Sequence, residues 1–176
     1  MSLLSYIELL ELQKQGVITN SLTEHVNSAS IDITLGNHIL VEVPSTSIVD
    51  ISRREPLAVS TRVIEYYDLE PGEFILAQSA QVFNLPDWLS AEYKLKSSLA
   101  RSGVDHANAG WCDAGWNGSV LTLELKNITR YHTIRIHAGE RIGQMVFFRH
   151  VEVPEWASYK KRGRYNGDTT VRGVKA

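Results

Sequence analysis

The segment from Lys96 to Asn127 holds most of the side chains whose types and spacing could do chemistry. At its start Lys96, Ser97, Ser98 and Arg101 lie within six residues. Hydroxyl, ammonium and guanidinium groups are the donors that bind phosphate, and a guanidinium can donate two parallel hydrogen bonds. The same residues would also suit a short capped helix with one surface arginine, and their spacing alone leaves both interpretations open.

A single carboxylate, Glu124, stands in the run VLTLELKN at residues 120–127. Alternation along this run puts three leucines on one face and Glu124, with Thr122, on the other, which predicts a half-buried strand. A lone glutamate is more often a solvated residue on the outer face of a sheet than a catalytic one. Its neighbours in the chain must therefore decide its role.

Between these two stretches lies the glycine-rich segment AGWCDAGWNG, in which Trp111 and Trp116 flank Asp113. An aspartate in such a segment can stabilise an Asx-type turn, and tryptophans in turns commonly pack as apolar anchors. The alternative is that Asp113 contacts a ligand.

Composition narrows the class of protein. The 176 residues suit one domain, 1–176, and the net charge of −2 without a basic block lacks the footprint of a general duplex nucleic-acid binder. One cysteine, Cys112, excludes an internal disulfide and a cysteine-rich zinc site, in agreement with a reducing cytoplasm. No apolar run has membrane-spanning length. We expect a cytoplasmic protein without nucleic-acid or membrane partners.

The elements that must position these residues are mainly strands. Ser5 and Glu8 have the spacing of a capping box, Tyr6, Leu9 and Leu10 follow helical spacing, and Gly16 is placed to end a short N-terminal helix. Short β-type runs separated by turn signals follow, which predicts a mainly β sandwich or jelly roll. The expected strands are Ile31–Leu35, His38–Val43, Phe74–Ala77, Ala91–Leu95, Val120–Leu125, Thr133–Ile136 and Ile142–Phe148.

The motifs KSSLAR, AGWCDAGWNG and LTLELKN together resemble the core of the dCTP deaminases, which belong to the trimeric dUTPase-like group. Upstream, SASIDITLGN and LEPGEFILAQSAQVFNLP resemble two further segments of that family, in the same order. The resemblance extends from Ser5 to Gly173. It implies a dUTPase-like distorted jelly-roll or β-sandwich with a short N-terminal helix, and a homotrimer with active sites between subunits.

The resemblance also implies roles for residues. Glu124 matches the family's catalytic glutamate, and Asp113 lies close to the position that dUTPases use to hold the sugar and activate water at the α-phosphate. The tail, about 159–176, resembles a flexible lid that orders over bound triphosphate. The residues expected to bind nucleotide or phosphate are Lys96, Ser97, Ser98, Arg101, Gly110, Trp111, Thr122, Tyr159, Arg164 and Asp168.

The reaction that the resemblance implies is hydrolytic deamination of dCTP to dUTP. One group must take a proton from the attacking water and return protons to the ring and to the departing amine, and a single carboxyl can do both in a dry site. Zinc deaminases need an H-x-E…P-C-x-x-C signature, which one cysteine cannot supply. We expect no zinc and no protein metal ligand, with Mg²⁺ bound only through the triphosphate.

Asn108 before the AGW triplet resembles the bifunctional enzymes that continue to dUMP and diphosphate. Several positions depart from the family: Lys96, where many members have arginine, Ser28, Gln81, Ala114, Arg164 and, above all, Asp168, whose carboxylate repels a triphosphate unless it meets Mg²⁺ or a base. Two alternatives stay open, and the departures at Lys96 and Asp168 favour the second of them. One is a dUTP pyrophosphatase of the same fold, and the other is a catalytically silent nucleotide-binding regulator.

Overall fold

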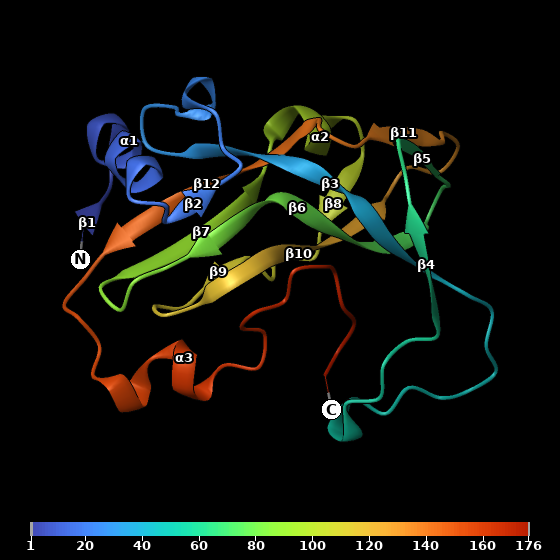
Figure 1. Cartoon of the computed structure of the whole chain (residues 1–176). Coiled ribbons are helices and arrows are strands. Elements are labelled where there is room, and N and C mark those ends of the chain that lie inside the picture. The colour runs from blue at the N-terminus through green and yellow to red at the C-terminus, as the bar shows by residue number, and fades with distance from the viewer. Residues whose placement is uncertain (1, 176) are drawn as a thin grey trace.

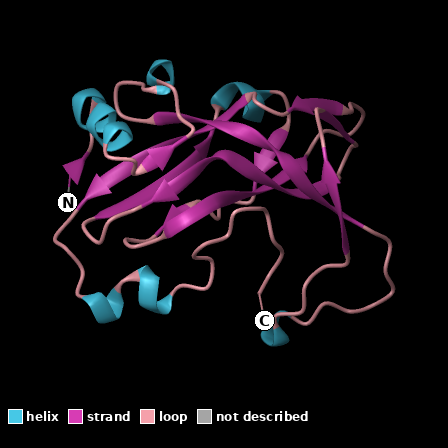
Figure 2. Ribbon diagram, in the orientation of Figure 1, coloured by secondary structure: helices cyan, strands magenta, loops and turns pink. Residues whose placement is uncertain are grey.

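The computed structural model describes residues 2–175 and is built mainly of antiparallel strands (Figures 1 and 2). Ten strands form one strongly curled sheet with the order β8-β10-β6-β3-β12-β7-β9, to which β1, β2 and β4 add at β12, β6 and β3. Strands β11 and β5 form a separate pair. The expected mainly β fold is confirmed. Met1 and Ala176, the ends of the expected domain, lie outside the described residues.

The strands have the following bounds: β1 Ser2–Leu3, β2 Ile18–Thr19, β3 Ile31–Glu42, β4 Val59–Val63, β5 Tyr66–Leu69, β6 Phe74–Asn84, β7 Leu89–Leu95, β8 Val104–His106, β9 Trp111–Cys112, β10 Asn117–Asn127, β11 Ile134–His137 and β12 Arg141–Arg149. The helices are α1 Tyr6–Lys14, α2 Ser97–Arg101 and α3 Tyr159–Arg162, with short 3₁₀ turns η1 Thr23–His25, η2 Ile51–Arg53 and η3 Glu155–Ala157. In the described part of the chain no helix is long and apolar enough to cross a bilayer.

Strand β3 joins the two halves of the curled sheet. Its first residues pair with β12, as in Ile31 opposite Met145, whereas its later residues pair with β6 and β4. The sequence predicted two strands here, separated near Gly36, and this was wrong because the backbone continues through the glycine. A Cβ at Gly36 would lie 2.7 Å from Gln78 Cγ, so the glycine permits close packing of β6 instead of ending the strand.

The alternation predicted for the Glu124 strand is confirmed. Leu121, Leu123 and Leu125 of β10 are buried in the core, and Glu124 faces the other way, with its side chain 23% exposed. The cross-strand partner of Glu124 is Leu76 on β6. Pairing on both edges of β10, with β6 and with β8, fixes the direction in which the carboxylate points.

The N-terminal helix is also confirmed. The Ser5 N–H donates to the Glu8 carboxylate at 3.1 Å, as a capping box requires, and Gly16 adopts a positive φ of 72° just after the helix. The buried face differs slightly from the expected one, because Leu9 and Leu12 are buried while Tyr6 is 44% exposed.

The C-terminal tail runs across the outer side of the sheet, beneath β10 in Figure 1. Backbone N–H groups of both parts donate hydrogen bonds across this contact: Val120 N donates to Asp168 O at 2.8 Å, and Val171 N donates to Gln78 Oε1 at 2.9 Å. The Trp116 indole N–H donates to Tyr165 O at 3.0 Å. The tail therefore forms one wall over the face of the sheet that carries Glu124.

Candidate active site

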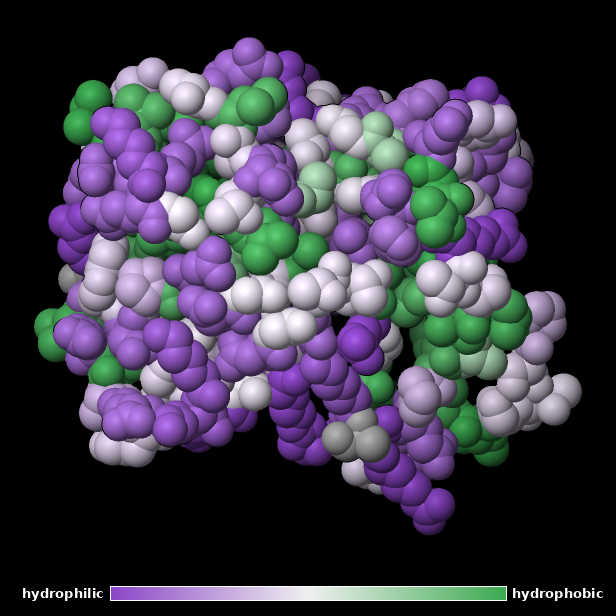
Figure 3. Space-filling model, in the orientation of Figure 1, coloured by the Kyte–Doolittle hydropathy of each residue, from purple (hydrophilic) through white to green (hydrophobic). Residues whose placement is uncertain are grey.

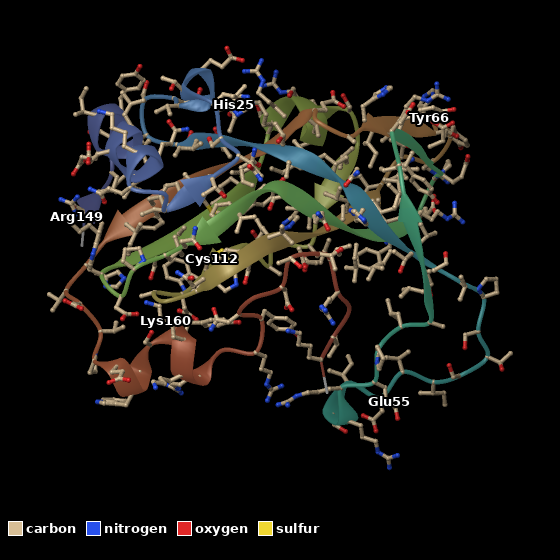
Figure 4. The ribbon with its side chains drawn as sticks, in the orientation of Figure 1. His25, Glu55, Tyr66, Cys112, Arg149 and Lys160 are labelled. Carbon is tan, nitrogen blue, oxygen red and sulfur yellow. The ribbon has the colours of Figure 1, made fainter. Side chains whose placement is uncertain are left out.

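A pocket of about 520 Å³ lies between the outer face of β10, the turn around Asp113 and the tail. Figure 4 labels Cys112 on the sheet side and Lys160 on the helix of the tail below it. Six residues that the sequence predicted as functional line this pocket: Trp111, Asp113, Thr122, Glu124, Tyr159 and Asp168. Four different segments of the chain contribute them, so folding brings together residues up to 57 positions apart, from 111 to 168.

The floor of the pocket is largely apolar, and Glu124 and Thr122 project from it. Strands β4 and β6 and the segment before β4 add Leu57, Val59, Phe74 and Leu76 to the lining. An apolar pocket with a few convergent polar groups is the usual form of a small-molecule site. The carboxylate of Glu124 therefore faces a cavity lined mainly by apolar side chains.

Asp113 is held in place by its own turn. The Trp111 indole N–H donates to Asp113 Oδ1 at 2.9 Å, and Trp111 is 55% exposed. Gly110 lies directly against strand β7, since a Cβ there would come within 2.6 Å of Tyr93 O. Gly110 therefore sets the path of this turn, while Trp111 and Asp113 reach the pocket.

The tail brings Asp168 and Arg172 to the lining of the pocket, and Lys175 pairs with Asp168 beside it. The Asp168 carboxylate accepts from Lys175 Nζ at 2.7 Å and lies 3.3 Å from Arg172 Nε. The repulsion expected between Asp168 and a triphosphate is thus countered by two cations of the same tail. Arg164, by contrast, contributes its backbone carbonyl to Lys175 and does not line the pocket. In Figure 3 the hydrophilic residues of the tail cover the lower centre of the molecule.

The predicted phosphate residues lie elsewhere in the chain. Ser97, Ser98 and Arg101 lie on helix α2, which leads into β8, and none of them lines the Glu124 pocket of the same chain. The short helix that the sequence allowed as an alternative does form. One copy of the chain therefore separates the proposed phosphate donors from the proposed catalytic carboxylate.

Lys96 has a structural partner that the sequence did not reveal. Its ammonium donates to Asp32 Oδ1 at 2.8 Å, and Asp32 is 2% exposed. Burial raises the pKa of Asp32, but hydrogen bonds from Lys96 and Asn27 and the charges of Lys96 and Arg141 outweigh it, so the pKa lies below its ordinary value. The ionised Asp32 is therefore the stable form in the folded chain.

Replacing Lys96 by Met is expected to lower the free energy of unfolding at pH 7 by about 1 to 3 kcal/mol, since a buried carboxylate loses a charged donor. Because the pKa of Asp32 is lower in the folded than in the unfolded state, ionised Asp32 stabilises the folded state at pH values above its unfolded pKa of about 3.9. This contribution is lost as the pH falls through the pKa of Asp32 in the folded state. The difference between variant and wild type should therefore shrink in acid. Denaturant unfolding from pH 7 to about pH 2 measures it.

The control is Lys94→Met, which breaks the exposed pair with Glu92 and should cost about 0 to 1 kcal/mol. Equal stability of the Lys96 and Lys94 variants at pH 7 would contradict a structural role for Lys96.

Sequence reasoning missed one residue that touches Glu124. His106, at the end of β8, is 8% exposed, and its Nε2 lies 3.2 Å from Glu124 Oε2. Nothing in the sequence favoured a catalytic over a surface position for this histidine. Strand β8 pairs with β10 so that His106 lies opposite Leu125, 19 positions further along the chain. This pairing brings His106 beside Glu124.

A groove of about 630 Å³ between α1 and the end of β12 is larger than the Glu124 pocket. Its polar groups include Glu8 and Arg149, which pair with each other at 3.4 Å, and it contains none of the predicted site residues. Size alone therefore does not select the candidate site, which we place where Asp113, Glu124 and the tail converge.

The chain is similar to known proteins along most of its length. The sequence profile of a family described as dCTP deaminase-like matches residues 3–150. The chain is 41% identical over 128 residues to a protein of Methanospirillum hungatei named "dCTP deaminase, dUMP-forming", covering 71% of this chain and 68% of the relative. It is 35% identical over 147 residues to a protein of the same name from Aquifex aeolicus, covering 84% and 78%.

Solved structures support the fold. The 2'-deoxycytidine 5'-triphosphate deaminase of Agrobacterium tumefaciens aligns over 82% of this chain and 47% of its own, with a TM-score of 0.64 and 22% identity. A mutant dUTPase of phage phi11 of S. aureus, described with a structural Mg(II) ion, aligns over 77% and 86%, with a TM-score of 0.52 and 16% identity. The family profile ends before the tail, at residue 150.

Proposed function

This chain belongs to the dCTP deaminase-like family, and we propose that it hydrolyses the 4-amino group of the cytosine base of dCTP, releasing ammonia. The observation that carries the proposal is the position of Glu124, which faces a largely apolar pocket together with Asp113. Relatives that match about 70% of the chain are named for this reaction. The pocket accommodates the base, with its exocyclic amine toward Glu124.

Glu124 acts as the proton carrier in two transfers. It takes a proton from water as the water oxygen bonds to C4, and it gives that proton to N3 of the ring. It then takes the second proton from the new hydroxyl and gives it to the amine, which leaves as ammonia while C4 becomes a carbonyl. Both protons of the water are thereby used, one on N3 and one on ammonia, and Glu124 returns to its starting state.

Asp113 serves a second step, hydrolysis of dUTP to dUMP and diphosphate. Relatives named as dUMP-forming support this extension. Asp113 lines the same pocket, and the Trp111 N–H that it accepts at 2.9 Å holds one of its oxygens, leaving the other for a water near the α-phosphate. The dUTP formed at Glu124 is the substrate of this step.

Magnesium fits this site as a companion of the nucleotide. Mg²⁺ commonly binds nucleotides through phosphate oxygens and waters, with few protein ligands. Residues 2–175 contain no group of three or more His, Cys, Asp or Glu side chains placed to hold a metal. In our proposal the triphosphate supplies the main ligands of the ion. When bound, the ion neutralises phosphate charge, and the chain's own residues carry out the proton transfers.

A triphosphate needs several cations, and among residues 2–175 the lining of the Glu124 pocket includes one, Arg172 of the tail. Ser97, Ser98 and Arg101 lie on α2, outside this pocket, and are available to a neighbouring molecule. We propose a homotrimer in which α2 of one copy contacts the phosphates of a nucleotide held at Glu124 of the next. The exposed Ile48 and Ile51, 88% and 87% accessible in the loop before β4, suit a contact between copies.

Mixing two inactive variants tests this arrangement. Glu124→Gln and Arg101→Ala remove groups that the shared site takes from different copies, so each variant alone should be nearly inactive. In a closed ring each site takes Glu124 from one copy and Arg101 from the next. After random reassembly of equal amounts, each of these groups is native in half of the copies, so about a quarter of the sites, and about a quarter of wild-type turnover, should be restored. Deamination assays after unfolding and refolding the mixture measure this. No recovery, with trimers formed, would contradict a shared site.

The dUTP pyrophosphatase alternative has a specific observation in its favour, the exposed Asp113 in the pocket. Parallel incubation with dCTP and with dUTP, in the presence of Mg²⁺, separates the two. A dCTP deaminase consumes dCTP and releases ammonia, whereas a pyrophosphatase alone converts dUTP and leaves dCTP unchanged. Unchanged dCTP would overturn the proposed function.

A further inference from the structure

The contact between His106 and Glu124 is enclosed by the protein. His106 Nε2 and Glu124 Oε2 are both buried and lie 3.2 Å apart. Among residues 2–175 neither atom has an aligned hydrogen-bond partner, although each is within hydrogen-bonding distance of the other. Leaving two such polar atoms buried costs stability unless they interact with one another. The question is therefore what the contact between His106 and Glu124 does for the carboxylate.

The proton content of the pair follows from its geometry. If both Nε2 and Oε2 lacked a proton, two acceptor lone pairs would face each other in a buried space, which is repulsive. A proton on Nε2, with Glu124 ionised as the proposed reaction requires, would make this 3.2 Å contact attractive.

Packing holds the imidazole at this position. The ring of Tyr93, which is 2% exposed, lies 4.7 Å from the His106 ring, and the Tyr93 hydroxyl is also buried without a partner in the described chain. The backbone keeps His106 beside Glu124 as well, because Ala107 N donates to Glu124 O at 3.2 Å and Asn108 N donates to His106 O at 2.6 Å. The imidazole therefore has little freedom to turn away.

The two oxygens of Glu124 are not equivalent. Oε2 is buried against His106, while the side chain as a whole is 23% exposed and lines the pocket. We propose that His106 is a positioning residue, whose Nε2–H holds Oε2 of Glu124 so that the other oxygen, Oε1, meets the attacking water and the base. The inference rests on the proposed deamination and names a residue that the reaction needs beyond Glu124.

Alignment of this contact should improve when the nucleotide closes the pocket. Catalytic hydrogen bonds are often poorly aligned without substrate and tighten in the complex. A fixed Oε2 leaves Glu124 one working oxygen, which suits a carboxylate that must move a proton from water to N3 and then a second one to the amine. A freely rotating carboxylate would lose this placement in most of its orientations.

The test compares His106→Asn with His106→Gln in full-length protein. Both are polar, but only the longer Gln can place an N–H near the position of Nε2. We expect the Asn variant to lower kcat for dCTP deamination about 100-fold with KM changed by less than about threefold, as for loss of one positioned donor. The Gln variant should retain kcat within about tenfold of wild type. Equal kcat in both variants, or a loss confined to KM, would overturn the proposal.

His25 provides a matched control, because it is also 8% exposed and its Nδ1 is buried without a partner among the described residues. His25→Asn should leave kcat unchanged; a loss equal to that of His106→Asn would assign both effects to general loosening and overturn the proposal. A wild-type protein that releases no ammonia from dCTP rejects the proposed function, whereas an active His106→Asn variant rejects this inference alone.

The protonation of the His106 ring can also be measured in the wild-type protein, so this second test does not depend on the folding of a variant. Nitrogen-15 NMR of the His106 ring at pH 7 should show a protonated Nε2. An unprotonated Nε2 would overturn the proposal.

Discussion

Replacing Glu124 by Gln is expected to lower kcat for dCTP deamination by about 10³-fold, the scale of general acid–base catalysis. An amide of nearly the same shape still faces the pocket, but it cannot accept a proton from water. Binding should persist, because the apolar lining from β4 and β6 and the tail do not depend on the charge of Glu124. Ammonia release and equilibrium binding of dCTP measure the two properties separately.

Glu92→Gln is the matched control for this substitution. Glu92 is also a strand glutamate, with a side chain 31% exposed, but it pairs with Lys94 and lies outside the pocket. Its replacement should leave kcat within about twofold, as is usual for surface substitutions away from a site. Deamination retained by Glu124→Gln would remove this residue from the mechanism.

Asp113→Asn is expected to separate the two reactions. Ammonia release should remain within about threefold of wild type, while release of diphosphate falls about 100-fold or more, since Asn cannot act as a general base. The product of dCTP should change from dUMP to dUTP. The Asn side-chain oxygen can still accept the Trp111 N–H, so the turn should keep its shape.

Chromatographic separation of the nucleotides reads out this change directly. The same variant incubated with dUTP should leave it almost unchanged. If Asp113→Asn still forms dUMP at the wild-type rate, Asp113 has only its turn-stabilising role. If ammonia release is lost as well, the assignment of Asp113 to a separate second step is wrong.

Local patterns in the sequence predicted much of the framework that positions Glu124. The alternation around Leu123 and Leu125 predicted which face of β10 is buried, because a half-buried strand has a strict two-residue period. The capping box of α1 could also be predicted, because it depends on two residues only three positions apart in the sequence. The break predicted near Gly36 failed because a glycine can serve close packing as well as a turn.

Contacts between distant segments could not be predicted from such patterns. Asp32 and Lys96 are 64 positions apart, and the use of Lys96 as a partner for a buried carboxylate depends on how β12 pairs with both β3 and β7. His106 meets Glu124 only because β8 adds to the edge of β10. Arg172 and Lys175, which pair with the Asp168 carboxylate, are close to it in sequence. Their position near the pocket depends on the path of the tail across β10.

The roles of the individual site residues stay predictions. Six of them converge on one pocket, while the α2 residues lie away from it in a single chain. That division is what an active site shared between copies requires.

Deamination of dCTP in the Glu124 pocket is tested by measuring the ammonia that the wild-type protein releases from dCTP in the presence of Mg²⁺. We expect one ammonia for each dCTP consumed, with a uracil nucleotide as product and with turnover lost in Glu124→Gln. Binding of dCTP without release of ammonia would contradict it and would identify the chain as a nucleotide-binding regulator.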